Sequence, residues 1–207
     1  MRVLIINGSP KDNGNTAIAL NEMRAVFDNY GIEVDYFHIG NEAIHGCVGC
    51  GTCYKNGKCF MDDCVNDLAQ RIEACDGMVI GSPVYYAAPN GSLVALLDRL
   101  FYSTRFDKRM KVGASVAVAR RGGCSTTFDQ LNKYFTISGM PLATSQYWNS
   151  VHGAKPGEAE GDLEGLQTMR TLAENMVFLM RSIALGKEKY GLPEREKPLR
   201  TNFISTL

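Results

Sequence analysis

Four cysteines lie within thirteen residues of this 207-residue chain, at a spacing that suits metal binding. Gaps of two residues let successive thiolates turn toward one centre, as iron–sulfur clusters and zinc ions both require. The fourth cysteine follows after five more residues, and Gly57 allows the chain to turn back, so one compact loop can supply four ligands. Three interpretations remain open: a cluster, a structural zinc ion, or reduced thiols that pack or pair without metal. The candidate ligands are Cys47, Cys50, Cys53 and Cys59.

A loop rich in hydroxyl and amide groups, residues 8–16, lies between an apolar run and a helical pattern. At such a junction, backbone N–H groups and the helix dipole favour phosphate. The loop is not a Walker loop, because five residues separate its glycines and Asn15 stands where that motif has lysine; GxGxxG is also absent. Its neutral donors predict a site for a phosphate monoester, and the alternative is a plain turn capped by Thr16. The candidate residues are Ser9, Lys11, Asn15 and Thr16.

A second loop, residues 82–91, combines adjacent tyrosines with two prolines that stiffen it. A rigid loop of aromatic and small residues suits a flat ring that stacks on one face and takes backbone hydrogen bonds at its edge. The alternative is that both tyrosines pack on the neighbouring helix. The candidate residues are Pro83, Val84, Tyr85, Tyr86 and Asn90.

A third loop, residues 120–123, has the sequence Arg-Arg-Gly-Gly. Its two glycines allow the backbone to approach a ligand closely. Its arginines suit a phosphate or a ring that becomes anionic, and the alternative is a solvated pair of charges. The candidate residues are Arg120, Gly122 and Gly123.

The elements that must position these loops alternate between strand and helix. Short apolar or alternating runs predict strands, and apolar residues at helical spacing predict helices. Such alternation favours one domain with a parallel sheet between helices, whose ligands bind at the carboxyl ends of the strands. Strands are expected over 2–6, 32–39, 77–81, 111–119 and 141–148, and helices over 16–30, from a cap at 62 or 63 to 75, and over 92–103, 126–139 and 162–185. The predicted division is a domain over 1–186, with a cysteine-rich insertion over 40–62, and a C-terminal extension over 187–207.

Charge and apolar content exclude several partners. Lysine and arginine total 22 and aspartate and glutamate total 22, so the net charge is zero, and no nucleic acid partner is expected. No run approaches the ~18 apolar residues of a membrane span, so no membrane partner is expected either. The first apolar run is too short for a signal peptide, and an odd number of clustered cysteines disfavours a secreted disulfide framework. A cytoplasmic location is expected.

Together the three loops predict a pocket for a monophosphorylated planar molecule. The same loops and the cysteine set also resemble the motifs of a known family. The sequence is similar to the flavodoxin-like NAD(P)H-dependent FMN reductases and, within them, to the iron–sulfur flavoproteins. The resemblance rests on GSPKDNGNT, SPVYYAAPNGSLVALLDR, the RRGG loop and the cysteine set followed by Asp62-Asp63, and it covers most of residues 1–150. One departure is Cys124-Ser125, where family members often have Gln-Glu.

The resemblance implies a flavodoxin-like, doubly wound, five-stranded parallel sheet in the order 2-1-3-4-5. It implies FMN with its phosphate in the first loop and its ring between the second and third, and a [4Fe–4S] cluster on the four cysteines. The implied activity is transfer of a hydride from NAD(P)H to FMN, with electrons passed on to a small-molecule or protein acceptor. The flavin carries that chemistry, so no catalytic side chain is predicted.

Two other functions compete with this one. A flavodoxin-like carrier without catalysis is one alternative, although such carriers are typically strongly acidic and this chain is neutral. A binding module with a zinc knuckle is the other.

The predicted topology also bears on assembly. The cysteine loop leaves the sheet after its edge strand, away from its own flavin, so a homodimer or homotetramer is expected in which the loop leans over a neighbour's FMN. The C-terminal arm, with Pro193, Pro198, Phe203 and Ile204, is expected to wrap that neighbour, and the alternative is an arm that packs on its own subunit of a monomeric fold.

Overall fold

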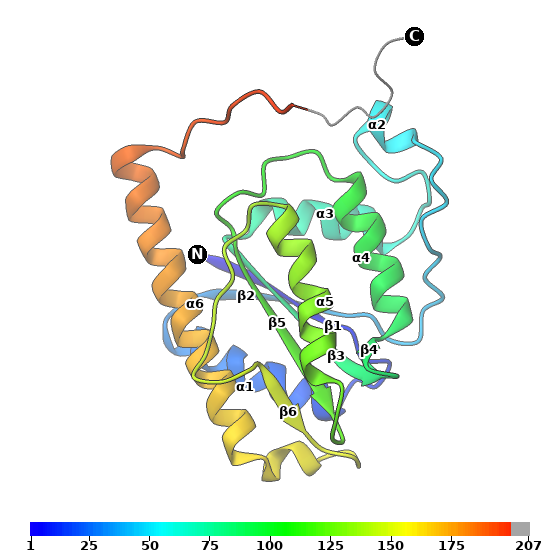
Figure 1. The fold of residues 1–207 in the computed structure, drawn as a ribbon, viewed down its shortest axis with the longest axis vertical. Coiled ribbons are helices and arrows are strands. Elements are labelled where there is room, and N and C mark those ends of the chain that lie inside the picture. The colour runs from blue at the N-terminus through cyan, green and yellow to red at the C-terminus, as the bar shows by residue number, and fades with distance from the viewer. Residues whose placement is uncertain (200–207) are drawn as a thin grey trace.

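The computed structural model describes residues 1–199 and shows a parallel sheet between two layers of helices (Figure 1). The parallel strands run in the order β2-β1-β3-β5-β6, which confirms the predicted flavodoxin-like sheet. The order differs from 2-1-3-4-5 in its labels because a two-residue strand, β4 (Ala88–Pro89), pairs antiparallel with the end of β3 and precedes the last two strands. The five parallel strands are β1 (Arg2–Asn7), β2 (Glu33–His38), β3 (Gly77–Tyr85), β5 (Val112–Ala119) and β6 (Ser150–His152).

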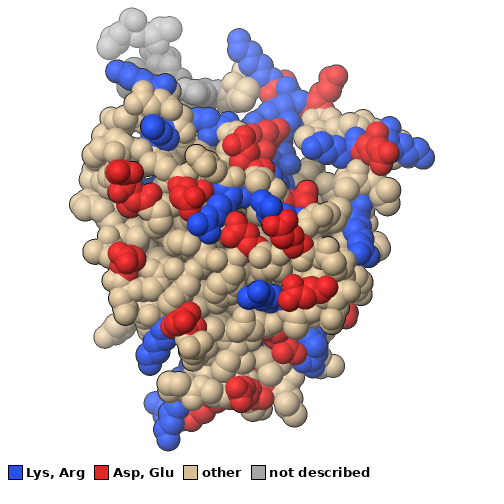
Figure 2. Space-filling view, turned by 180° about the vertical axis from the view of Figure 1, so that it is seen from behind, with Lys and Arg blue, Asp and Glu red and all other residues tan. Residues whose placement is uncertain are grey.

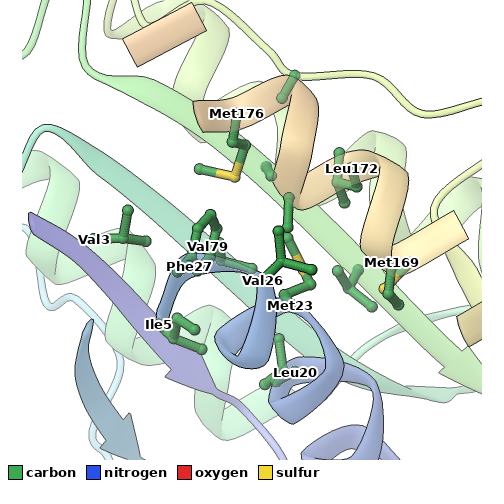
Figure 3. Packing of buried hydrophobic residues seen from close by; sticks show 14 of the residues in the cluster. Val3, Ile5, Leu20, Met23, Val26, Phe27, Val79, Met169, Leu172 and Met176 are labelled. Carbon is green, nitrogen blue, oxygen red and sulfur yellow. The ribbon is translucent and has the colours of Figure 1, made fainter. Parts of the chain in front are cut away.

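Helices α1 (Asn15–Asn29) and α6 (Leu163–Tyr190) cover one face of the sheet (Figure 1). Apolar residues recur every three or four positions along both helices, so each presents one stripe to the sheet. Figure 3 shows this layer, in which alternate strand residues point up into the side chains of both helices. The residues it labels are Val3, Ile5, Leu20, Met23, Val26, Phe27, Val79, Met169, Leu172 and Met176.

Helices α3 (Cys64–Ala74), α4 (Gly91–Ser103) and α5 (Cys124–Ile137) pack on the opposite face. The cap of α3 is Asp63, whose carboxylate accepts a hydrogen bond from the Val65 N–H at 3.2 Å. The predicted apolar face of α4 is confirmed, because its four leucines are completely buried. These are Leu93, Leu96, Leu97 and Leu100.

The predicted fifth strand over 141–148 is wrong. Only Leu142 in that range bridges to the sheet, at Gly113, and the chain then leaves the sheet until β6 begins at residue 150. The physical reason is local: the Ser145 hydroxyl donates to the Tyr147 carbonyl at 2.6 Å and to Asn149 Oδ1 at 2.8 Å. Such side-chain bonds stabilise a turn in place of a strand ladder.

The segment that carries the cysteines contains a short helix, α2 (Thr52–Asn56), where an irregular loop is predicted. Left-handed glycines flank it, Gly51 at φ +71° and Gly57 at φ +70°, and only glycine adopts this conformation at little cost. Gly57 therefore allows the turn back toward Cys59.

The C-terminal helix α6 continues to Tyr190, beyond its predicted end at 185. The proposed division of the chain after residue 186 falls inside this helix and stays a prediction. Phe203 and Ile204 of the predicted arm lie outside the described residues.

The molecular surface mixes both signs of charge. Basic and acidic side chains are interspersed over the face seen in Figure 2, as the balanced composition leads one to expect. None of the helices within residues 1–199 combines the length and apolarity that a membrane crossing needs.

Candidate functional site

A cavity of about 230 Å³ lies at the carboxyl ends of β1, β3, β5 and β6, and we call it the sheet-edge cavity. Proteins with parallel sheets bind ligands at the carboxyl ends of the strands, because the loops that follow neighbouring strands converge there. The lining residues are Ser9, Lys11, Gly14, Asn15, Thr16, Pro83, Val84, Tyr85, Val118, Ala119, Arg120, Gly153 and Ala154.

The first loop is held to its neighbours by its own polar groups. The Ser9 N–H donates to Asn7 Oδ1 at 3.0 Å, and Ser9 Oγ accepts from the Lys11 N–H at 3.1 Å. His38, at the end of β2, contacts the Ser9 carbonyl through Nε2 at 2.8 Å. Ser9, in the loop after β1, and Thr16, in the first turn of α1, are both buried. The loop is thus shaped before any ligand binds.

Asn15, on the wall of the sheet-edge cavity, connects the beginning of α1 with the segment after β6. Its Nδ2 donates to the Lys155 carbonyl at 2.9 Å, and its Oδ1 accepts from the buried Ala159 N–H at 3.2 Å. Both ends of this amide are therefore engaged with the segment after β6. The structure gives Asn15 a part in holding that segment, in addition to its place on the cavity wall.

The second loop forms a β-hairpin. Its turn residues Tyr86 and Ala87 have φ values of +52° and +57°, which places both in the left-handed region. Thr126 Oγ1 donates to the Ala87 carbonyl at 2.7 Å. Gly123 packs so closely on the hairpin that a Cβ there would lie 2.8 Å from Ala87 Cα. The third loop therefore sets the position of the second.

The sheet-edge cavity brings most of the predicted residues together. Eight of the twelve line it: Ser9, Lys11, Asn15, Thr16, Pro83, Val84, Tyr85 and Arg120. The other four, Tyr86, Asn90, Gly122 and Gly123, do not. Tyr86 is fully exposed at the hairpin tip. Asn90 caps α4 through the Ser92 N–H and donates to the Gly8 carbonyl at 2.8 Å.

One wall of this cavity, formed by Gly153 and Ala154 after β6, is not among the residues predicted from the sequence. The misplaced fifth strand hid this wall, although the Gly-Ala sequence after His152 signals a close backbone approach. Glu158 fixes this segment, because its carboxylate accepts from the N–H groups of Ala154 and Lys155 at 2.8 and 2.9 Å. These hydrogen bonds lower the pKa of Glu158.

A second cavity, the cysteine cavity, is bordered by all four predicted metal ligands. Cys53 is buried, Cys59 is half-buried, and Cys47 and Cys50 are exposed. Among residues 1–199, no three histidine, cysteine, aspartate or glutamate side chains meet closely enough to hold a single metal ion. The lining residues are Cys47, Val48, Cys50, Gly51, Cys53, Cys59, Phe60, Met61, Arg99, Tyr102 and Ser103.

Arg99 lies at this cavity, and its side chain is only 1% exposed. It pairs with Asp63 at 2.5 Å and also donates to the Cys59 sulfur. Burial opposes the charge of Arg99, but hydrogen bonds to Asp63 and Cys59 outweigh it and raise the pKa. Burial likewise opposes ionisation of Asp63, but hydrogen bonds from Arg99 and the Val65 N–H lower its pKa. The sequence signal for this residue is an arginine on the apolar face of α4, three positions after Leu96.

Helix α4 separates the two cavities. Asn90 at its N-terminus contacts the first loop, whereas Arg99, Tyr102 and Ser103 in its last turns border the cysteine cavity. Thirteen residues form the helix, which corresponds to a length of about 20 Å. In Figure 1, α2 accordingly lies at the opposite end of the molecule from β4 and β6.

The fold and its two cavities define a flavodoxin-like α/β protein with one ligand cavity at the switch point of the sheet and one lined by cysteines. Comparisons with known proteins agree. The family model described as NADPH-dependent FMN reductase matches residues 1–155. An iron-sulfur flavoprotein of Methanocaldococcus jannaschii is 32% identical over 191 residues, which span 88% of this chain and 99% of that protein. The chain therefore belongs to the NADPH-dependent FMN reductase family, whose members are FMN oxidoreductases, and to its iron–sulfur flavoprotein branch.

Solved structures add the fold alone. The crystal structure of RosB with a bound 8-demethyl-8-formylriboflavin-5'-phosphate intermediate superposes with a TM-score of 0.72 at 14% identity, covering 99% of this chain and 92% of that one. The NAD(P)H:quinone oxidoreductase from Methanothermobacter marburgensis superposes with a TM-score of 0.67 at 15% identity, covering 86% and 97%.

Proposed function

We propose that this chain is an oxidoreductase that takes a hydride from NAD(P)H onto bound FMN and passes the electrons to an acceptor. The observation that carries the proposal is the sheet-edge cavity, which gathers residues from all three predicted loops. When bound, FMN supplies the hydride chemistry, and the chain supplies binding, orientation and charge.

The first loop is the proposed phosphate site. Ser9 and Thr16 offer hydroxyl donors beside the N-terminus of α1, whose free N–H groups favour an anion. Lys11 adds a positive charge on the same wall. The ring is assigned to the space between the hairpin, with Val84 and Tyr85, and Arg120 on the other side.

The phosphate assignment is tested by the double variant Ser9→Ala, Thr16→Ala. Losing one neutral donor costs ~1–2 kcal/mol, which is several-fold to about thirtyfold in affinity. FMN binding should weaken while riboflavin binding, which involves no phosphate, should change little. Thr136→Ala, an exposed residue far along α5, is the matched control. Unchanged FMN affinity in the double variant would show that the loop is not the phosphate site.

Hydride transfer is tested by mixing the FMN-loaded protein with NADH or NADPH under argon in a stopped-flow spectrometer. Bleaching of the flavin at a catalytically useful rate supports the oxidoreductase. No bleaching with either nucleotide favours the flavodoxin-like carrier, which a protein partner reduces.

For the cysteine cavity we propose a [4Fe–4S] cluster on Cys47, Cys50, Cys53 and Cys59. Four thiols border one cavity, a buried arginine adds positive charge, and relatives are named iron-sulfur flavoproteins. A [4Fe–4S] cluster binds one thiolate at each iron, so its ligands need not meet at a single atom. These residues therefore suit the chemistry of such a cluster.

Anaerobic purification followed by quantitation of iron, sulfide and zinc tests this assignment. Cys50→Ala should lose the iron, and Cys64→Ala, a half-buried cysteine at the beginning of α3, should retain it. If the protein contains zinc and no sulfide, the site holds a structural zinc ion and not a cluster. If it contains neither iron nor zinc, the four thiols bind no metal.

We further propose that the chain acts as a homodimer or homotetramer. About 20 Å of α4 separates the two cavities of one chain, so electrons pass more easily to the FMN of a neighbour. Arg109 Nη1 donates to the Pro193 carbonyl at 3.1 Å, so the beginning of the C-terminal arm contacts its own chain and only the residues after it are available to a neighbour. Light scattering of the full chain, compared with a chain truncated after Gly191, tests this proposal. A monomer at micromolar concentration in both would rule out the route between subunits.

A further inference from the structure

Arg99 uses all five of its N–H donors at the cysteine cavity. Its Nε and Nη2 groups donate to Cys59 Sγ at 3.4 and 3.3 Å. Its Nη1 and Nη2 groups donate to the two carboxylate oxygens of Asp63 at 2.5 and 2.9 Å, and Nη1 also donates to the His45 carbonyl at 3.2 Å. An arginine offers five donors in one plane, so its hydrogen-bonding capacity is filled.

Cys59 is held from two sides, one through its backbone and one through its sulfur. Asn66 Oδ1 accepts from the Cys59 N–H at 2.9 Å, and Asn66 Nδ2 donates to the Cys59 carbonyl at 3.0 Å. Arg99 contacts the sulfur itself. Backbone position and sulfur electrostatics are therefore controlled by two different residues on two different helices.

Two opposite charges, those of Arg99 and Asp63, lie beside the Cys59 sulfur. Arg99 brings one positive charge and Asp63 one negative charge, so a thiolate at Cys59 makes the trio net negative. Hydrogen bonds to cluster sulfurs and the local charge set the reduction potential of iron–sulfur centres. A fixed cation with N–H···S bonds favours the state that carries the additional electron.

We propose that Arg99 is a positioning residue that raises the reduction potential of a cluster held by Cys59. The inference rests on the cluster proposed above. Reduction adds one electron and moves no proton at Arg99, because a guanidinium keeps its charge. Asn66 in contrast holds the ligand in place without touching its sulfur.

Three variants separate these two roles: Arg99→Met removes charge and donors, Arg99→Lys keeps the charge with fewer donors, and Asn66→Ala frees only the backbone. The measurement is an anaerobic redox titration of the iron-loaded protein followed by electron paramagnetic resonance, with iron retention measured in parallel. Arg99→Met should shift the reduction equilibrium at least tenfold toward the oxidised state, which is ~59 mV more negative for one electron. Arg99→Lys should shift the reduction equilibrium in the same direction by a smaller factor. If Arg99→Met does not fold, the Arg99→Lys variant alone tests the inference.

Asn66→Ala should lose iron faster and leave the potential unchanged. The inference is overturned if the loaded Arg99 variants titrate at the wild-type potential, or if Asn66→Ala shifts the potential as much as they do. Either result leaves the proposed cluster standing. A wild-type protein that holds no cluster overturns both the cluster and this inference.

Discussion

Replacing Gly123 with alanine should disturb the sheet-edge cavity without touching a ligand. Gly123 has φ +90°, and an added Cβ would lie 2.8 Å from Ala87 Cα and 2.9 Å from Val84 Cγ1. The left-handed conformation costs a residue with a Cβ about 1–2 kcal/mol, and overpacking adds about 1–3 kcal/mol. The free energy of unfolding should therefore fall by about 2–5 kcal/mol. Because the clash is with the hairpin backbone, Val84 and Tyr85 should move and weaken FMN binding.

Gly122→Ala is the matched control for this experiment. Among the described residues, no atom lies within 4 Å of the position that a Cβ at Gly122 would occupy, and its φ is not positive. Its unfolding free energy should change by less than about 0.5 kcal/mol, as for an ordinary surface substitution. Urea unfolding followed by circular dichroism and fluorescence titration with FMN measure both variants. Equal stability and equal FMN affinity in the two variants would refute the argument that Gly123 positions the hairpin.

Three further predictions concern single side chains. Asn15→Ala removes two hydrogen bonds of about 1 kcal/mol each, so urea should unfold the apo protein at a lower concentration. FMN and riboflavin should both bind more weakly to this variant. The control is Asn13→Ala, a substitution at an exposed residue. A loss confined to FMN would show that Asn15 acts as a phosphate ligand alone. Glu158→Gln should lower the free energy of unfolding at pH 7, because the hydrogen bonds that lower the pKa of Glu158 stabilise the fold only while this carboxylate is ionised. The difference in stability between the variant and the wild type should disappear as the pH falls below the ordinary carboxyl pKa of about 4.5. A difference that persists in acid would contradict this. Completely buried Leu96→Ala should lower the free energy of unfolding by about 2–5 kcal/mol in urea, and a loss below 1 kcal/mol would contradict the packing of α4.

Residue order along the chain was enough to predict the fold class and most of the sheet-edge cavity. Apolar residues at helical spacing and short apolar runs are local signals, so β1, β3, β5 and α4 were recognisable one at a time. The alternation of strands and helices is compatible with few topologies, and those topologies bring the three predicted loops together at the carboxyl ends of the strands. The cysteine spacing likewise placed four thiols in one segment, and the structure shows them around one cavity.

Tertiary structure alone decided the features that depend on distant partners. Whether residues 141–148 joined the sheet depended on Ser145, whose hydroxyl bonds within its own turn. The sequence predicts Asn15 as a phosphate ligand, but in the structure its side-chain amide forms hydrogen bonds with Lys155 and Ala159, which are 140 or more residues away along the chain. The buried charge of Arg99 is intelligible only once α3 and α4 bring Asp63 and Cys59 beside it. Local periodicity reports which face of an element is apolar, whereas a buried polar group is stabilised by partners that only the folded chain brings within hydrogen-bonding distance.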